Sequence, residues 1–306
     1  METYPQLNLW ERPRSQHMHL ILGWRQWADA GSTSSALPQY LVELTNARKI
    51  GEIRPDDFYL FQLPGTHHFL RPMIQLDEGM VQGLEMRRNE IFYTGNEEQG
   101  LLIFIGDEPH LHVEQYAAVL LHLAQTLRVE KAVALGGVYG SIPYDKERYI
   151  SCSYSLASMK AELDEYAMHY SNYEGGVTIG SYMVARAAEQ KLAWLALHAL
   201  VPAYDFGYEP IAQGLRIEND FKAWYDILRR LGRLFGLRLN LRELEEQSLQ
   251  LRLSLDEQLA TLMDESADFD IQAYMTQLAE EFNELTFDPL DDVWTEGLEG
   301  LFGDES

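Results

Sequence analysis

Short runs of hydrophobic residues recur along the first two thirds of the chain, and stretches with helical spacing separate several of them. The runs lie at Met18–Gly23, Phe58–Phe61, Leu101–Ile105, Ala132–Leu135, Tyr149–Tyr154 and Leu192–Ala199. A short continuous apolar run is typical of a strand that is buried on both faces, as in a parallel sheet covered by helices. Because helices alternate with these runs, the pattern predicts an α/β fold with a mostly parallel sheet.

Helical spacing is clearest from Val113 to Leu127, where apolar residues three or four positions apart share one face. The same spacing predicts helices at Leu156–His169 and Ser181–Gln190. Ser32–Thr45 is also predicted to be helical, although it contains Pro38. Proline lacks the amide hydrogen and is tolerated only in the first turn or at a kink. We therefore expect this helix to begin late or to bend.

Helical periodicity dominates the chain after about residue 215. Asn240, with Glu243 three residues later, resembles a capping box at the start of a helix. A spacer at Asp264–Phe269 favours an antiparallel helical hairpin. The predicted helices are Phe221–Leu234, the run after Asn240, the run from Ile271 to Leu285, and a short segment at Leu290–Phe302. We therefore divide the chain into an α/β body, residues 1–215, and a helical extension, residues 216–306.

Small and polar residues follow several of the predicted strands. Gly136 and Gly137 come directly after Ala132–Leu135, and glycine lets the backbone turn sharply or approach another surface closely. In open α/β sheets, ligands usually bind at the carboxyl ends of the strands. We therefore predict a shared rim that contacts a ligand or a partner. Its candidate residues are Trp24, Trp27, Asp29, Gly31, Gly106, Gly136, Gly137, Ser141, Gly175, Thr178 and Ser181.

Charge and cysteine content indicate which partners the protein can bind and in which cellular compartment it functions. The net charge is −24, and residues 241–306 hold 19 acidic residues against 2 arginines. Such a surface is a poor partner for nucleic acid, because binding depends on Lys and Arg that neutralise phosphates. The single cysteine, Cys152, cannot form an internal disulfide. With no signal-peptide core and no 18-residue apolar run, the sequence predicts a soluble cytoplasmic protein with no membrane contact.

The familiar signatures of catalysis are missing from the sequence. No Gly-x-Ser-x-Gly elbow surrounds Ser141 or Ser181, and no P-loop is present. The glycine turn at Glu174–Ser181 opens a predicted helix, so it either binds an anion or lets the helix pack on a strand. Ser141 is interpreted as a structural serine in a turn. Trp24 and Trp27 either line a pocket or pack in the core.

A second local cluster could in principle bind a metal ion. Asp107, Glu108, His110 and His112 carry ligand atoms, but their spacing across a proline-containing loop matches no specific metal pattern. Asp107 or His110 could instead cap the next helix. In the same way, Asp29 could cap the following segment or hold the Ala30–Gly31 turn. We therefore expect neither a metal nor a cofactor.

Several segments, taken in order, resemble the proteasome assembly chaperone two family, in its larger bacterial form with a C-terminal helical extension. They are LILGWRQWADAG, LLIFIGDEPHLHVEQYAAVL, ALGGVYGSIPYDKER, YEGGVTIGSYMVARAAEQ and LAWLALHALVPAY, and the later LNLRELEEQ also fits. The resemblance implies a three-layer α/β/α sandwich of the phosphorylase/hydrolase-like kind. It also implies self-association, with a trimer as one arrangement, and a scaffolding or chaperone-like role that is not enzymatic.

The resemblance further implies proteasome components as partners, with one departure. Assembly chaperones of this kind can end in a hydrophobic-Tyr-x tail that docks on the proteasome, whereas this sequence ends Phe302-Gly-Asp-Glu-Ser306. We therefore do not expect docking through such a tail. The alternative function is an enzyme that acts on a small anionic or nucleoside-like substrate at the rim. An ATP-dependent ligase is a third interpretation without a supporting motif.

Overall fold

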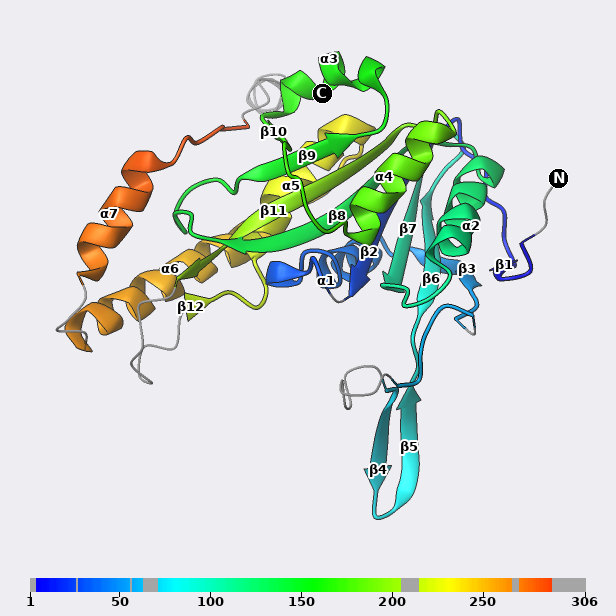
Figure 1. The fold of residues 1–306 in the computed structure, drawn as a ribbon, viewed down its shortest axis with the longest axis horizontal. Helices are drawn as coiled ribbons and strands as arrows, with labels where there is room; N and C mark the ends of the chain where they lie inside the picture. Colours follow the sequence, from blue (N-terminus) through cyan, green and yellow to red (C-terminus); the bar gives the residue numbers. More distant parts are fainter. Residues whose placement is uncertain are drawn as a thin grey trace, which may run out of the picture.

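The computed structural model describes residues 4–25, 27–55, 57–62, 71–204, 215–265 and 270–287. Figure 1 shows a twisted sheet with helices on both faces and a two-stranded hairpin that extends away from the body. The strands are β1 (Leu7–Leu9), β2 (His17–Arg25), β3 (Arg48–Ile53), β4 (Met73–Asp77), β5 (Met80–Glu85), β6 (Asn89–Gly95), β7 (Gln99–Asp107), β8 (Val129–Gly140), β9 (Ile150–Tyr154), β10 (His169–Tyr170), β11 (Trp194–Tyr204) and β12 (Leu215–Arg216). The α-helices are α1 (Ala36–Leu44), α2 (Val113–Thr126), α3 (Lys160–Leu163), α4 (Ile179–Glu189), α5 (Phe221–Phe235), α6 (Arg242–Glu265) and α7 (Ile271–Glu281).

The sheet has a parallel centre and antiparallel flanks. Its order is β1-β3-β6-β7-β2-β8-β11-β9-β10, and β12 pairs with β11. The central strands β7, β2, β8 and β11 are parallel to their neighbours in this group. On the flanks, β6 runs antiparallel to β7 and β9 runs antiparallel to β11, whereas the outermost β10 is parallel to β9. The carboxyl ends of four long strands therefore meet along one edge, where the candidate rim lies.

Side chains of the central strands point alternately into two cores, which explains the continuous apolar runs in the sequence. In β2, Leu20 and Leu22 enter a core beneath α2 and α4, whereas Ile21 enters a core beneath α1 and α5. Because both faces of the sheet are covered, nearly every position of a central strand must be apolar. The predicted α/β fold, with helices on both faces of its sheet and a helical C-terminal region, is confirmed.

The first correction concerns Phe58–Phe61, which is not a strand. Phe58 lies in a turn, and its amide donates to the carbonyl of Pro55 at 2.9 Å. Phe58 is fully buried by docking onto the body, and its carbonyl accepts hydrogen bonds from the amides of His110 and Leu111. Phe58 is therefore buried by a single turn, whereas Phe61 is 63% exposed, and a sequence pattern cannot distinguish such a turn from a short strand.

The second correction concerns Leu156–His169, which is not one continuous helix. It forms two 3₁₀ turns, Ala157–Met159 and Asp164–Tyr166, on either side of the short α3. The chain then turns through Ala167, whose φ is +47°, into β10. The guanidinium of Arg230 donates to the carbonyls of Tyr166 and Ala167, which fixes this turn. By contrast, α1 does begin late and has Pro38 in its first turn, as predicted.

The C-terminal helices pack against the body and against one another. Helix α5 lies in the core beneath the sheet, where Trp224 Nε1 donates to the carbonyl of Gly31 at 2.9 Å. Leu255 and Leu259 of α6 and Ile271 of α7 share a smaller buried cluster with Val201 of β11. The predicted helix at Leu290–Phe302 lies outside the described residues. Within the described residues, no helix is both long enough and apolar enough to cross a bilayer.

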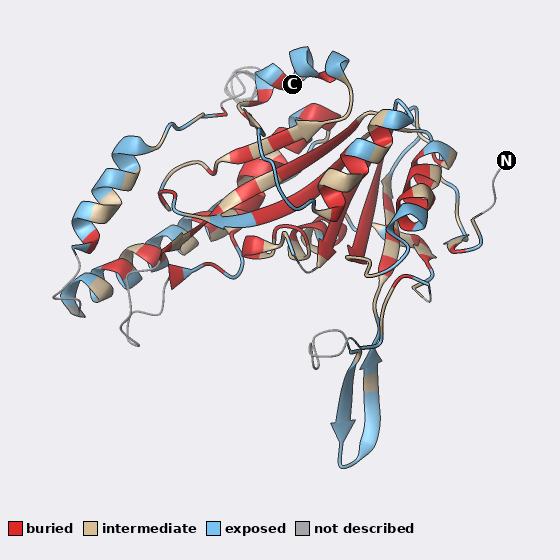
Figure 2. Cartoon of the chain, viewed as in Figure 1, coloured by how far each residue is buried: buried red, intermediate tan, exposed pale blue. Residues whose placement is uncertain are grey.

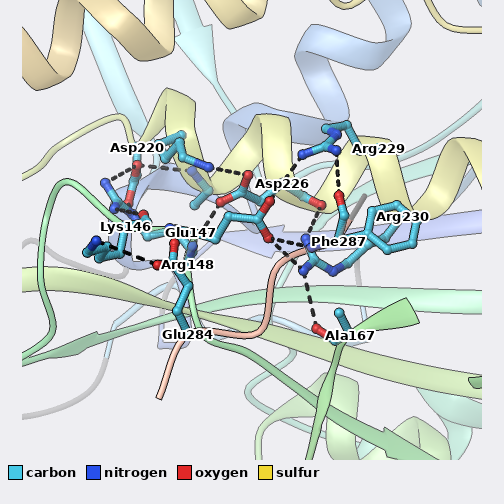
Figure 3. A network of polar contacts seen from close by, with 12 residues as sticks. Lys146, Glu147, Arg148, Ala167, Asp220, Asp226, Arg229, Arg230, Glu284 and Phe287 are labelled. Atoms are coloured by element: carbon cyan, nitrogen blue, oxygen red, sulfur yellow. Dashed lines mark hydrogen bonds and ion pairs between the residues drawn. The ribbon is translucent and has the colours of Figure 1, made fainter. Parts of the chain in front are cut away.

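A buried polar network joins α5 to the loop after β8 and to the chain beyond α7 (Figure 3). Arg148 donates from Nε and Nη2 to the carboxylate of Asp220 at 2.8 and 3.2 Å, and both residues are almost fully buried. Glu147 accepts hydrogen bonds from Arg229, Arg230 and the amide of Phe287. The network therefore fastens the segment at residue 287 to the body.

Candidate functional site

The carboxyl ends of β2, β8 and β11 and the start of α4 surround a very small cavity. A water-sized sphere can occupy about 20 Å³ in it, which is room for about one water molecule. The lining residues are Trp24, Arg25, Trp27, Ala28, Ser34, Glu108, Ala134, Leu135, Thr178, Ile179, Gly180 and His198. The structure thus brings Trp24, Trp27 and Thr178 of the predicted rim together around a centre that side chains already fill.

Trp24 is a core residue that supports this rim from below. It is 3% exposed, packs against Phe104, and donates from Nε1 to the hydroxyl of Tyr116 at 2.9 Å. Tyr116 in turn donates to the side chain of Asn89. Trp24 therefore fixes the end of β2 in place and presents little surface to a ligand.

Asp29 organises the loop between β2 and α1. Its Oδ1 atom accepts hydrogen bonds from the amides of Ser34 and Ser35 at 2.9 and 2.8 Å, just before α1 begins. Burial raises the pKa of this carboxyl, and the hydrogen bonds from Ser34 and Ser35 act against that shift. The expectation that Asp29 caps the following segment agrees with these contacts.

Two glycines allow the loop after β2 to lie directly on neighbouring backbone. A Cβ atom at Gly137 would stand 2.0 Å from the carbonyl oxygen of Ala30, because Gly137 pairs with Asp29 in a single β-bridge. Gly31 has a φ of +62°, and a Cβ atom there would stand 2.7 Å from Asp220. Both glycines are therefore needed for packing between segments, and neither leaves open space for a ligand.

The remaining predicted glycines and Ser141 either allow close packing between segments or lie exposed on the surface. A Cβ atom at Gly136 would meet the ring of His198, and one at Gly106 would meet Asn89 and Phe104. Gly175 is exposed in a loop beside Tyr173. Ser141 is exposed just beyond the end of β8 and does not line the cavity. The predicted set therefore mixes core spacers with surface positions.

The start of α4 is occupied by the protein's own polar groups. Thr178 Oγ1 caps the helix by accepting from the amide of Ser181 at 3.1 Å. Glu108 Oε1, at the end of β7, accepts from the amide of Ile179 at 3.2 Å. Burial raises the pKa of Glu108, and backbone hydrogen bonds from Ile179 and Trp27 act against that shift. An internal carboxylate thus fills the position that an anionic ligand would take at a helix start.

His198 and Thr178 form the one contact in the cavity that resembles catalytic geometry. His198 Nε2 lies 3.5 Å from Thr178 Oγ1, at the limit of a hydrogen bond. Burial lowers the pKa of His198, which favours the neutral form of its imidazole. The Thr178 hydroxyl, however, also contacts Ser181 Oγ at 3.2 Å. A lone hydroxyl–imidazole pair in a water-sized cavity has no room for an organic substrate.

Exposed aromatic and aliphatic side chains lie on the segments that lead to the cavity, after β2 and before α4. Trp27 is 64% exposed, and its ring lies so close to Gly176 that a Cβ atom there would be 2.8 Å away. Tyr173 and Val177, from the same loop as Gly176, are 72% and 53% exposed. We call Trp27, Tyr173 and Val177 the rim patch. Exposed aromatic side chains of this kind are typical of protein contact surfaces.

The suggested metal cluster is dispersed among separate partners. The Asp107 carboxylate is fully buried and accepts from Arg25 Nε at 2.8 Å and from Arg87 Nη1 at 3.2 Å. Glu108 caps α4, while His110 Nδ1 accepts from the amide of Leu60. Among the residues that the structure describes, no group of three or more potential ligands is placed to hold a metal ion.

Sequence reasoning did not assign Glu108 and His198 to the rim. His198 is the single strongly polar side chain in the apolar strand β11, and this exception in the pattern is a usable signal. Glu108 follows β7 directly, but only the fold shows that it reaches the start of α4. The contact depends on residues 71 positions apart in the chain, and local patterns do not report such contacts.

The comparisons with known proteins agree with the fold and with the earlier resemblance. The model of the PAC2 family matches residues 23–259. The Mycobacterium tuberculosis protein Rv2714, of unknown function, has a TM-score of 0.72 at 16% identity, covering 96% of this chain and 94% of its own. A second Mycobacterium tuberculosis protein, the proteasome-assembly chaperone homologue Rv2125, has a TM-score of 0.70 at 19% identity, covering 86% of this chain and 100% of its own. Pyrococcus furiosus PbaB, an archaeal proteasome activator, has a TM-score of 0.56 at 16% identity, covering 82% and 97%. Among curated proteins, none matches the sequence.

Proposed function

Because the chain belongs to the PAC2 family, we propose that it is a chaperone-like scaffold that binds proteins, associates with copies of itself and catalyses no reaction. The observation that carries this proposal is the rim itself. Its centre holds about one water molecule, whereas its outside exposes Trp27, Tyr173 and Val177. A ligand pocket normally encloses several hundred Å³, so the rim is better suited to contact with another protein.

The known roles named for two structural neighbours support proteasome-related partners. PbaB is an archaeal proteasome activator, and PbaA is an archaeal homologue of a proteasome-assembly chaperone. We therefore propose components of a proteasome, or of a related protease, as the proteins that this chain binds. We also propose a cytoplasmic setting, since the one cysteine, Cys152, is a buried free thiol.

The direct test is a photo-activated cross-linking residue placed at Val177 in the cell of origin. We expect covalent adducts with protein, identified by mass spectrometry, because Val177 belongs to the rim patch. The matched control places the same residue at Leu253, which is 46% exposed on α6 and distant in sequence. Adducts at both positions, or at neither, would contradict a specific protein contact at the rim.

The enzymatic alternative rests on one observation, the contact between Thr178 and His198. It requires that the two loops carrying Trp27 and Val177 move to admit a small anionic or nucleoside-like substrate. Binding of such a compound would raise the melting temperature by mass action. A set of nucleosides and phosphorylated metabolites that raises it for the native chain, but not for Thr178→Val, would favour the enzyme over the scaffold.

A further inference from the structure

The hairpin β4–β5 extends from the body without packing on it (Figure 1). Its two strands are joined by Glu78 and Gly79, whose φ angles are +46° and +85°. Positive φ at both central residues is typical of the tight turns that join twisted antiparallel strands. The turn residues therefore favour a regular hairpin, although the apolar pattern of the sequence predicts no core on this side of the body.

The cross-strand pairs on one face of this hairpin are all apolar. Ile74 pairs with Leu84, and Leu76 pairs with Val81 across a bulge, so these four side chains lie on the same side. They are 54%, 56%, 59% and 59% exposed, respectively, and Figure 2 shows the hairpin exposed along its length. We call these four residues the hairpin face. The opposite face is mixed, since its cross-strand pairs are Met73–Glu85, Gln75–Gly83 and Asp77–Met80.

An isolated two-stranded hairpin is marginally stable in water unless its apolar face packs on something. In the described part of the chain, none of the four side chains of the hairpin face is buried. The base of the hairpin, however, is held firmly. Arg25 Nη1 donates to Glu85 at 2.7 Å, and Arg87 pairs with the buried Asp107. The hairpin is therefore joined to the body by ion pairs at its base, while the apolar side chains of the hairpin face stay exposed.

Charge limits what this arm can contact. The chain carries a net charge of −24, so two copies repel one another over most of their surfaces. The hairpin face and the rim patch are both free of charged side chains. One chain therefore presents two apolar surfaces, at separate places, whose own side chains add no charge to a contact.

We propose that the hairpin face of one copy docks on the rim patch of a second copy of this chain. The proposal rests on the proposed self-association and names the surfaces that produce it. A stable interface buries about 800 Å² on each partner, and four hairpin side chains supply only part of that. In a head-to-tail arrangement each copy buries both its arm and its rim. Such a contact forms a closed ring when the rotation between copies closes.

The test compares two charge-matched variants by light scattering during gel filtration. Ile74→Lys with Leu84→Lys places two lysines on the hairpin face. Gln75→Lys with Gly83→Lys places the same cross-strand pair on the opposite face, where a Cβ atom at Gly83 meets nothing nearer than 3.6 Å. Both variants put like charges opposite each other in the hairpin. We expect multiples of 35.2 kDa for the native chain and the Gln75/Gly83 variant, and a 35.2 kDa monomer for the Ile74/Leu84 variant.

The possible results distinguish a failure of the hairpin contact from a failure of self-association itself. A native chain that is monomeric at micromolar concentration would overturn both. An oligomer that persists in the Ile74/Leu84 variant would overturn the hairpin proposal and leave self-association standing. Dissociation of both variants would show that the hairpin is needed only as a folded element, and would also overturn docking through the hairpin face.

Cysteine cross-linking then tests the second surface. The native Cys152 is buried, and burial raises its pKa to about 12, so it reacts little. One chain carries Leu84→Cys and a separate chain carries Val177→Cys, and a short bis-maleimide is added to their mixture. We expect a covalent dimer that contains one of each chain, and a much lower yield with Gly83→Cys. An oligomer without this product would overturn the rim as the docking surface.

Discussion

At the scale of single residues, Gly137 shows how a glycine after a strand can define a rim without leaving room for a ligand. Its Cα lies against the Ala30 carbonyl, so the methyl group of Gly137→Ala would stand 2.0 Å from that oxygen. Relief requires a shift of backbone, not of a flexible side chain. We expect the free energy of unfolding to fall by about 1–3 kcal/mol, as for an overpacked core.

Urea denaturation of Gly137→Ala checks this expectation. Gly83→Ala is the control, because its methyl group would meet nothing nearer than 3.6 Å, and its unfolding free energy should change by less than about 0.5 kcal/mol. An unchanged midpoint for Gly137→Ala would mean that the loop from Asp29 to Gly31 does not rest on β8.

Glu108 makes a pH-dependent contribution at the same rim. Burial raises its pKa above the ordinary value of 4.5, so the folded protein binds this proton more tightly than the unfolded chain does. The stabilising effect of the proton is complete below about pH 4.5, and it is lost as the pH rises through the raised pKa of the folded state. Glu108→Gln keeps a neutral side chain at every pH.

We therefore expect the melting temperature of Glu108→Gln, relative to the native chain, to be higher at pH 7 than at pH 4.5. The difference between the two proteins cancels the effect of acid on the rest of the chain. Differential scanning fluorimetry at several pH values measures it. A relative melting temperature that instead rises toward low pH would show that the Ile179 and Trp27 amides outweigh burial at this carboxylate.

At the scale of elements, the apolar pattern predicted those strands and helices whose burial is local and regular. The central strands were predictable because alternate residues enter two cores. The turn at Phe58 and the broken helix at Leu156–His169 were not, since their form depends on contacts with His110 and Arg230, which are distant in sequence. The hairpin was missed because its face is exposed, although the turn at Glu78–Gly79 was a readable signal.

Phe287 is the buried aromatic residue at the end of the described chain. Phe287 is 3% exposed, stacks on Tyr166 and lies over the guanidiniums of Arg229 and Arg230. Its amide donates to Glu147 Oε2 at 3.1 Å. We expect Phe287→Ala to release this segment while the sheet stays folded, because α5 and the strands keep the other contacts of the core to which Phe287 belongs.

Hydrogen exchange with mass spectrometry separates these regions. Peptides that cover 282–287 should exchange at least about tenfold faster in Phe287→Ala, as expected when a local contact worth more than 1.4 kcal/mol is lost. Peptides of β2 and β8 should be unchanged. Phe282→Ala, which removes a half-exposed ring from the same segment, is the control. Equal effects of both changes would contradict a specific role for Phe287.

At the scale of the whole molecule, the boundary between body and extension can be tested by truncation. A boundary at residue 215 is a prediction from the sequence, yet α5 contributes Trp224 and Leu228 to the core beneath the sheet. We expect a chain of residues 1–239 to be soluble and folded, and a chain of residues 1–215 to aggregate because that core opens. Circular dichroism and solubility measure the difference. A folded 1–215 chain would instead support the boundary at residue 215.

Because the net charge is −24, the salt dependence of self-association distinguishes an apolar contact from one made by ion pairs. If uncharged surfaces meet, added salt screens only the repulsion between acidic copies, since the screening length falls from about 14 to about 4 Å between roughly 50 and 500 mM NaCl. The dissociation constant, measured by analytical ultracentrifugation, should therefore fall as salt rises. A contact made by ion pairs would weaken over the same range. The Gln75→Lys with Gly83→Lys variant should follow the native trend, because its added charges lie away from the hairpin face.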